Sequence, residues 1–176
     1  KTPWPLIVPG LLLALASSVA ADVRVLTFEG VGDLAPVGEF YNGAGGPTLN
    51  LGISFGPNGL GLIDQDVPEG QTPGSGVFAN EPSPSTVLTF KEAGAIVVNV
   101  PAGFSVGFAT YYVSTDNAFL RAWSGPDGQG VMLGELALED QKVTGPGDPL
   151  PINGTTFGVW DTEGVTFDGV ALSLTI

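Results

Sequence analysis

Apolar and polar positions alternate along residues 105–138 in three short runs. The runs cover residues 105–113, 118–123 and 132–138, and turn-forming Ser, Thr, Asn, Asp, Pro and Gly residues separate them. A period of two, with aromatic and β-branched side chains at alternate positions, is typical of half-buried strands. We therefore expect these runs to form three consecutive strands of an antiparallel meander.

Further short apolar segments predict strands on both sides of the meander. They cover residues 23–28, 53–56, 60–64, 86–90, 95–100, 156–160 and 165–176. The turn at residues 57–59 predicts a hairpin between the second and third of these segments, and the turn at residues 91–94 predicts pairing of the fourth with the fifth. Because no helical period persists after residue 21, we predict one all-β domain over residues 22–176. Its expected architecture is a two-sheet antiparallel β-sandwich of jelly-roll topology.

The last apolar segment changes phase partway along. Val165 and Phe167 are in phase with each other, whereas the apolar residues from Val170 onward lie one position out of step. A shift of one residue exchanges the two faces of a strand, so we predict a β-bulge near Asp168 and Gly169. Beyond the bulge we expect the large apolar residues to be buried and the small residues between them to form a mildly polar face.

The first 21 residues have the pattern of a Sec signal peptide. A basic residue, Lys1, precedes an apolar run at residues 6–16, and small residues at 18–21 suit signal peptidase. The apolar run is too short to span a membrane. We therefore expect cleavage before Ala21 or Asp22, which leaves four basic and 18 acidic residues and a net charge of −14.

The composition excludes several classes of function. The chain has 18 acidic and five basic residues, a net charge of −13, and only 13% charged residues in total. Binding to nucleic acid or to anionic membranes requires clustered Lys and Arg, which this chain lacks, whereas binding of cations such as calcium is compatible. The absence of Cys and His removes disulfides, thiolate metal sites and the commonest general base.

Several segments resemble a known family. They are residues 26–30 (LTFEG), a Tyr at 41, residues 52–55 (GISF), residues 123–130 (WSGPDGQG) and residues 165–171 (VTFDGVA). In order and spacing they resemble the jelly-roll domain of secreted bacterial proteins that carry a PEP-CTERM sorting signal. Those proteins end in a Pro-Glu-Pro motif, an apolar helix and a basic tail, and the sequence stops at Ile176 without these features. The resemblance implies an exported bacterial protein, extracellular or at the cell surface, with a biofilm-matrix role and no catalysis.

Acidic residues at two predicted strand ends suggest a calcium site. Glu29 ends the first predicted strand and Asp168 lies at the predicted bulge in the last one. The first and last strands of a sandwich are often adjacent, so we expect these residues to meet, with Asp33 and the carbonyl near Gly30 supplying further oxygens. The pattern resembles the structural calcium site of many carbohydrate-binding jelly rolls. A second acidic cluster at residues 64–69 lacks the spacing of an EF-hand, and the alternative for both clusters is solvated surface acids.

Aromatic residues suggest a surface that binds extracellular polysaccharide. Phe119, Arg121 and Trp123 alternate on one face of a predicted strand, which places a cation between two rings. Tyr111 is followed by a second tyrosine, and adjacent residues in a strand point to opposite faces, so one of the two points away from the core. Trp160 completes this candidate ligand-binding set, and core packing is the alternative for each ring.

Candidate catalytic patterns are few. Ser54 lies in a GISFG segment that matches the serine-hydrolase elbow, but no helix follows and the chain has no His. Asp161 and Glu163, beside Trp160, could form the carboxylate pair of a glycoside hydrolase, but solvated loop acids are the favoured explanation. The Asn153 glycosylation pattern only places its loop at the surface.

The sequence therefore predicts an exported, non-catalytic protein with a structural, biofilm-matrix or adhesion role. The alternative is a carbohydrate-binding module with a structural calcium ion, and a glycoside hydrolase is a third hypothesis. A binding module requires a concave face or cleft with two or more exposed aromatic rings. A matrix protein does not, so the arrangement of these rings distinguishes the first two hypotheses.

Overall fold

The computed structural model describes residues 22–114, 116–140 and 157–176. The predicted signal peptide and the Asn153 pattern fall outside these residues. The described chain contains strands and two short 3-10 turns, η1 (Phe40–Asn42) and η2 (Pro47–Leu49). The predicted all-β class is confirmed. Within these residues no helix has the length and apolar character needed to cross a membrane.

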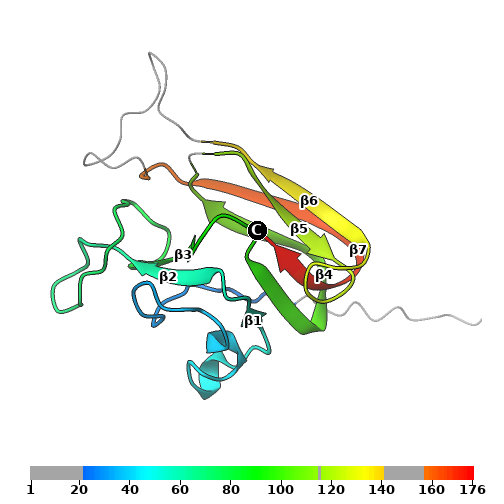
Figure 1. Ribbon diagram of the computed structural model, residues 1–176, viewed down its shortest axis with the longest axis horizontal. Coiled ribbons are helices and arrows are strands. Elements are labelled where there is room, and N and C mark those ends of the chain that lie inside the picture. Colours follow the sequence, from blue (N-terminus) through cyan, green and yellow to red (C-terminus); the bar gives the residue numbers. More distant parts are fainter. Residues whose placement is uncertain (1–21, 115, 141–156) are drawn as a thin grey trace, which may run out of the picture.

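The strands form two antiparallel sheets (Figure 1). They are β1 (Ser54–Phe55), β2 (Gly59–Ile63), β3 (Thr86–Phe90), β4 (Val97–Tyr112), β5 (Ala118–Trp123), β6 (Met132–Leu138) and β7 (Asp161–Thr175). The larger sheet has the order β1-β4-β7-β5-β6, and the smaller one pairs β2 with β3. Two antiparallel sheets agree with the predicted sandwich, and its jelly-roll topology stays a prediction.

The two predicted local hairpins are wrong. Phe55 of β1 lies opposite Val98 of β4, and Leu60 of β2 lies opposite Thr89 of β3. The turns at residues 57–59 and 91–94 therefore carry the chain from one sheet to the other. Phe55 and Val98 are both buried in the same core, so the burial of these side chains decides the pairing and the turn signals decide only where the chain reverses.

The predicted strand at residues 23–28 is also wrong. Val23 and Val25 are 80% and 72% exposed, so the alternating apolar residues of this segment do not form the buried face of a strand. Phe28 adopts a positive φ of 63°, which ends any extended run. Its N–H donates a hydrogen bond to the Tyr41 hydroxyl (2.7 Å) instead of joining a sheet.

The predicted meander is a hairpin plus one long strand. β5 and β6 pair as expected, with Leu120 opposite Leu136. β4 instead pairs along its length with β7, from Val97 opposite Thr175 to Tyr112 opposite Asp161. Because β7 begins at Asp161, the segment predicted as a separate strand at 156–160 contributes only an isolated bridge at Phe157.

The predicted bulge in the last strand is confirmed, but the buried face is reversed. Phe104 lies opposite Ala171 and Val106 opposite Phe167, so β7 carries two extra residues there. Ala171 and Ser173 are fully buried, whereas Val170 is 56% exposed. The reason is the loop after β5, because the Ser173 hydroxyl donates to the carbonyl of residue 125 (2.6 Å) and accepts the N–H of residue 128 (3.0 Å).

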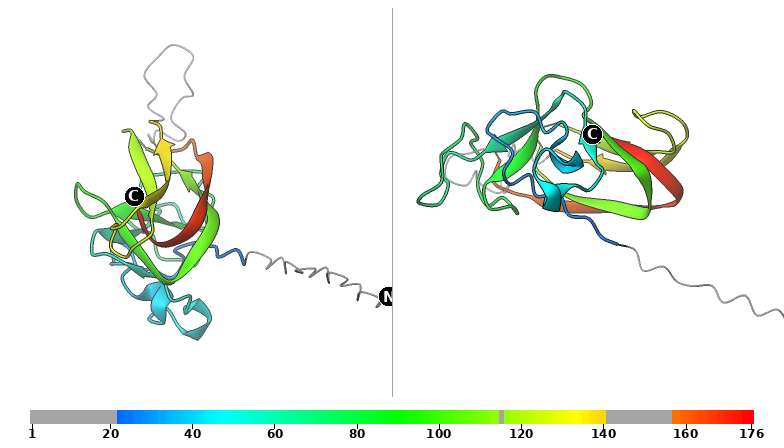
Figure 2. Two further views of the ribbon diagram at one scale, coloured as in Figure 1. Left: turned by 90° about the vertical axis from the view of Figure 1, so that its right-hand side faces the viewer. Right: turned by 90° about the horizontal axis from the view of Figure 1, so that it is seen from below.

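Two apolar cores meet at the end of β7. The first consists of Val31, Val37, Tyr41, Ile53, Phe55, Ile96 and Val98. The second consists of Leu120, Leu136 and Leu138, with Phe108, Tyr112 and Val165 packed against them. The large sheet curls so that β5 and β6 face β4 and β7 across this second core (Figure 2). Leu174 and Ile176 pack against both cores and join them.

Candidate functional site

The predicted aromatic and cationic residues of β5 point outward from the second core. Leu120 and Ala122 are buried, at 4% and 0% exposure. Since side chains alternate along a strand, Phe119 and Arg121 lie on the opposite face, and the Phe119 side chain is 44% exposed. The same alternation that fills the core therefore presents these two side chains to solvent.

The Arg121 guanidinium is held between a ring and a carboxylate. Its Cζ lies 4.7 Å from the centroid of the Phe119 ring, so the predicted cation–π contact is confirmed for this pair. Its Nε donates to Glu135 Oε2 at 2.7 Å, and Glu135 lies directly opposite on β6. We call Phe119, Arg121, Glu135 and the exposed Ala137 the hairpin face.

A shallow depression adjoins the hairpin face. It encloses about 440 Å³ and is lined by Asn117, Phe119, Ala137, Glu139 and Asp140, among others. The Asn117 Oδ1 accepts the N–H of Asp140 (3.0 Å), which fixes the amide at its rim. An aromatic wall beside an amide and two carboxylates is the chemistry that binds a sugar ring through its apolar face and its hydroxyls.

The other aromatic residues of the predicted set lie elsewhere. Trp123 is half-buried, and its Nε1 donates to Thr175 Oγ1 (2.9 Å), which ties β5 to β7. Trp160 donates from Nε1 to the carbonyl of Ala79 (3.0 Å). Tyr111 is 58% exposed, but it lies on β4, across the second core from Phe119. The hairpin face therefore has one well-exposed aromatic ring.

Glu29 has a role that the sequence did not indicate. Its Oε1 accepts the backbone N–H groups of Ser85 (3.0 Å) and Thr86 (2.8 Å). Its Oε2 accepts their hydroxyls, at 3.1 and 3.3 Å. Ser85 and Thr86 are buried at the start of β3. Glu29 therefore fastens a loop to the small sheet, over a sequence separation of 56 residues that no local pattern reveals.

Asp33 also binds protein donors. Its carboxylate accepts the N–H of Ile63 (3.0 Å) and both the N–H (3.1 Å) and the hydroxyl (2.8 Å) of Ser75. Burial acts to raise the pKa of Asp33, but these hydrogen bonds outweigh it and lower the pKa below its ordinary value. The carboxylate fastens the loop around Ser75 to the end of β2.

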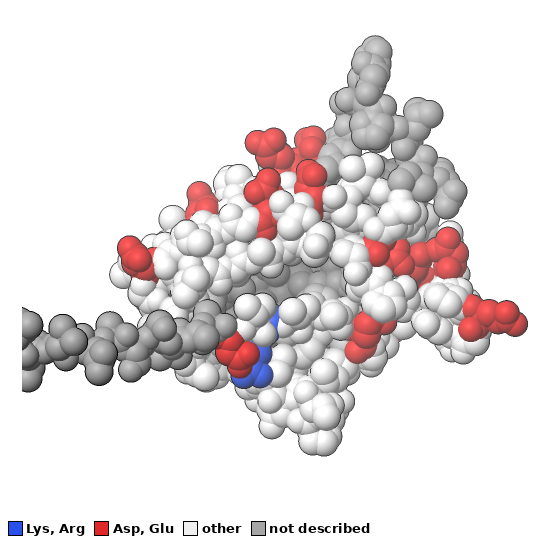
Figure 3. Space-filling model, turned by 180° about the vertical axis from the view of Figure 1, so that it is seen from behind, with Lys and Arg blue, Asp and Glu red and all other residues white. Residues whose placement is uncertain are grey.

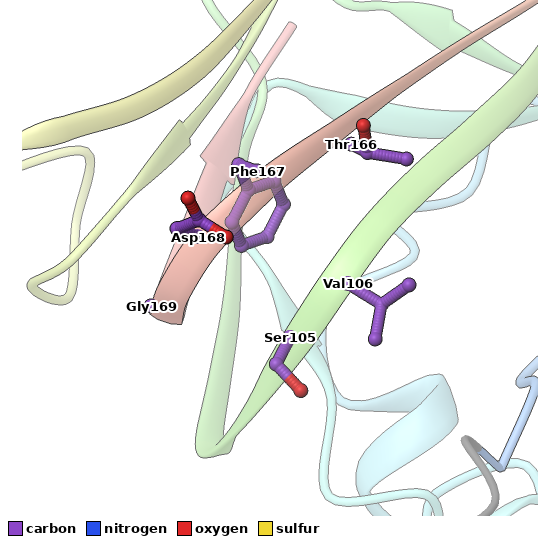
Figure 4. Close-up of a pocket in the computed structure, with 6 residues that line it drawn as sticks. All are labelled: Ser105, Val106, Thr166, Phe167, Asp168 and Gly169. Carbon is purple, nitrogen blue, oxygen red and sulfur yellow. The ribbon is translucent and has the colours of Figure 1, made fainter.

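Asp168 lies at the bulge, apart from the other two predicted calcium ligands. It lines a concavity of about 500 Å³ with Ser105, Val106, Thr166, Phe167 and Gly169, all from β4 and β7 (Figure 4). In the part of the chain that the structure describes, no three acidic, His or Cys side chains form a group able to hold a metal. The structure therefore does not bring Glu29, Asp33 and Asp168 together, and calcium binding stays a prediction.

The second acidic cluster contains a buried carboxyl group. Asp64 is 3% exposed, and its Oδ1 accepts the N–H of Gln65 (2.7 Å). Burial, a hydrogen bond with Asp66 and the charges of Asp66 and Glu81 raise the pKa of Asp64 to about 6. The sequence pointed to residues 64–69 but not to Glu81, which the fold brings close.

The candidate catalytic residues Ser54, Asp161 and Glu163 lie on strands of the large sheet. Ser54 lies in β1 opposite Asn99, so its segment does not form the strand-to-helix turn of a hydrolase elbow. Asp161 and Glu163 are exposed at the start of β7. They lie opposite Tyr112 and Thr110, beside the end of β4.

The chain matches no family model, no curated protein and no solved structure. Its class is therefore the one that the fold defines, an acidic all-β protein with two antiparallel sheets.

Proposed function

We propose that this is an exported, non-catalytic protein that acts outside the cell in a structural, biofilm-matrix or adhesion role. The observation that carries the proposal is the amount of apolar side chain on the surface of the large sheet. Five of the 12 exposed large apolar residues of the described chain lie on strands of the large sheet: Val106, Tyr111, Phe119, Met132 and Val170. Exposed apolar side chains on both outer sides of the curled sheet are available for contacts with other macromolecules.

The charge distribution supports the same proposal. Acidic side chains are spread along the rim of the molecule, whereas basic ones appear at one place in this view (Figure 3). Such a surface repels nucleic acid and anionic lipid. The resemblance to PEP-CTERM proteins and the predicted signal peptide add the expectation of export.

The experiment is cell fractionation in the encoding organism. We expect the mature chain, beginning at Ala21 or Asp22, in the matrix or cell-surface fraction, and a weaker matrix after deletion of the gene. Mass spectrometry of the N-terminus tests the predicted cleavage independently. Recovery of the uncleaved chain from the cytoplasm contradicts the proposal.

A carbohydrate-binding module is the second candidate, and the hairpin face favours it. Phe119 forms a wall of the depression while Arg121 and Glu135 supply a donor and an acceptor beside it. The single well-exposed ring is fewer than a binding module generally requires, which is why the matrix role ranks first. Glycan-array binding that is lost in Phe119→Ser but kept in Phe90→Ser, an exposed ring on the small sheet, supports the module; an array without hits contradicts it.

A further inference from the structure

One edge of β4 is unpaired over half of the strand. β1 covers this edge only at Val98 and Asn99, while β7 pairs with the other edge. Within residues 22–114, 116–140 and 157–176, no strand or bridge is bonded to it from Phe104 to Tyr112. Alternate residues of this stretch therefore direct their N–H and C=O groups away from the sheet.

The open edge lacks the features that protect exposed strands. Proteins commonly block a sheet edge with lysine, proline or a bulge. The stretch Phe104–Tyr112 contains no charged residue and no proline, and no charged residue occurs anywhere from Ala93 to Thr115. The register irregularities of β4 lie between Asn99 and Val106, and from there to Tyr112 the ladder with β7 is continuous. The result is an uncharged edge that is regular from Gly107 to Tyr112, while Val106 at its start has a φ of 80°.

We propose that this edge pairs with the same edge of a second copy of the chain. The pair is antiparallel and centred on Ala109, so that β7 and β4 of one copy continue into β4 and β7 of the other as one sheet. An edge that pairs with itself about a twofold axis gives a closed dimer. The inference is independent of the proposed function, since it depends only on the edge.

Self-pairing brings together two edge strands that carry no charge. Each copy carries a net charge of −13, so two copies repel one another over most of their surface. The open edge strand itself carries no charge, and the exposed acids nearest to it, Asp161 and Glu163, lie on β7, one strand further from the contact. The exposed residues of this stretch of β4 include Val106 and Tyr111, which are 59% and 58% exposed and gain apolar contacts on pairing.

The register follows from side-chain size. Centring on Ala109 places Tyr111 opposite Gly107 of the second copy and Thr110 opposite Phe108. A tyrosine opposite a glycine covers backbone that the glycine leaves bare, which is a favourable cross-strand pair. The small Ala109 side chain at the axis lets the two backbones approach.

A charge at the axis tests the proposal. Ala109 is exposed, so Ala109→Lys leaves the core intact but places two lysines opposite one another at the axis, with Cα atoms about 5 Å apart. Thr162→Lys is the matched control, because Thr162 is exposed on β7, opposite Tyr111 and one strand away from the edge. Sedimentation equilibrium of the full chain over about a hundredfold concentration range should show a dimer for wild type and Thr162→Lys. It should show a monomer for Ala109→Lys, with the circular dichroism spectrum and melting temperature showing that both variants fold.

A cysteine at the axis tests the register. The chain contains no Cys, so one introduced thiol can react only with another copy. Opposed residues of an antiparallel pair have Cα atoms about 4.5–5.5 Å apart, within the range for a disulfide. Ala109→Cys should therefore form a covalent dimer under mild oxidation, whereas Thr166→Cys, exposed on β7, should not.

Three results overturn the proposal. A monomeric wild-type chain shows that another part of the chain covers the edge or that its partner is a different protein. An Ala109→Lys variant that dimerises as wild type does places the contact elsewhere. Equal crosslinking of Ala109→Cys and Thr166→Cys shows random collision. Failure of glycan binding or of export changes none of these results.

Discussion

At the scale of single residues, Asp64 couples stability to pH. Its pKa is raised to about 6 from an ordinary value of 3.8, so between these values the folded chain binds more protons at this site than the unfolded chain. The contribution of Asp64 to stability is therefore fully present below about pH 4 and is lost as the pH rises through 6. The ionised carboxylate costs on the order of 2–3 kcal/mol. We expect Asp64→Asn to melt several degrees above wild type at pH 7.5. At pH 4 the two proteins should have the same melting temperature.

Thermal melts from pH 4 to pH 8 measure this effect. Glu69→Gln is the control, because it removes the same charge from an exposed position in the neighbouring loop. A variant at Asp64 that keeps the wild-type dependence on pH would assign the effect to another group.

Val106 holds a strained backbone conformation. Its φ is 80°, a region that a β-branched residue rarely adopts, and its side chain is 59% exposed. We expect Val106→Gly to stabilise the fold by about 1 kcal/mol, because glycine adopts this conformation without a steric penalty. Val170→Gly is the control: Val170 is similarly exposed but has no such φ, so the same change should destabilise. Chemical denaturation at low protein concentration compares the two, and destabilisation of both would refute the strain.

The sequence shows which residues are acidic, but not which carboxylates accept hydrogen bonds from distant parts of the chain. Glu29 and Asp33 were placed in one calcium site because both lie near the first predicted strand. Their hydrogen-bond partners, Ser85 and Ser75, are 56 and 42 residues away. A carboxylate that accepts distant backbone donors has no local pattern, so its role is visible only once the chain is folded.

At the scale of elements, Glu29 fastens the first core to the small sheet. Glu29→Ala leaves the backbone N–H groups of buried Ser85 and Thr86 without their acceptor, and we expect a loss of about 3 kcal/mol in the free energy of unfolding. Glu29→Gln keeps one carbonyl oxygen for these donors and should cost about 1 kcal/mol. Urea denaturation measures both, with the exposed Glu92→Ala as control. Equal losses in the two Glu29 variants would contradict this account of the contact.

Strand positions were largely predictable, and strand pairing was predictable only for β5 and β6. Alternation located β5 and β6 and the phase change located the bulge, because both are consequences of which side chains are buried locally. The pairing of β4 with β7 joins residues that are 49 to 78 positions apart, from Tyr112 with Asp161 to Val97 with Thr175. No local pattern records which distant strand is the partner. The burial of Ser173 depended in the same way on a loop that covers it from a distance.

The candidate site was predictable in part for the same reason. Phe119 and Arg121 are two residues apart on one strand, so alternation placed them side by side, and the structure adds Glu135 from the next strand. Tyr111 and Trp160 come from other strands and loops, whose positions relative to β5 are set by the topology. Their separation from the hairpin face was therefore beyond reach of the sequence pattern.

At the scale of the whole molecule, the net charge of −13 opposes folding through repulsion among the acidic residues. We expect added NaCl to raise the melting temperature, because salt screens this repulsion. The calcium hypothesis predicts a further rise with millimolar CaCl₂ at matched ionic strength, lost in Asp168→Asn. Differential scanning calorimetry compares the two salts, and identical melting temperatures would contradict calcium binding.

The place of Leu174 and Ile176 in both cores has a consequence for biogenesis. These residues follow every other described element along the chain, yet neither core is complete without them. The Ile96 and Ile176 backbones also exchange hydrogen bonds at 2.9 and 3.0 Å. A nascent polypeptide therefore cannot reach its final packing until translation has passed these positions. This dependence on the last residues fits the export that we propose, because a chain whose cores have not closed can pass through a secretion channel.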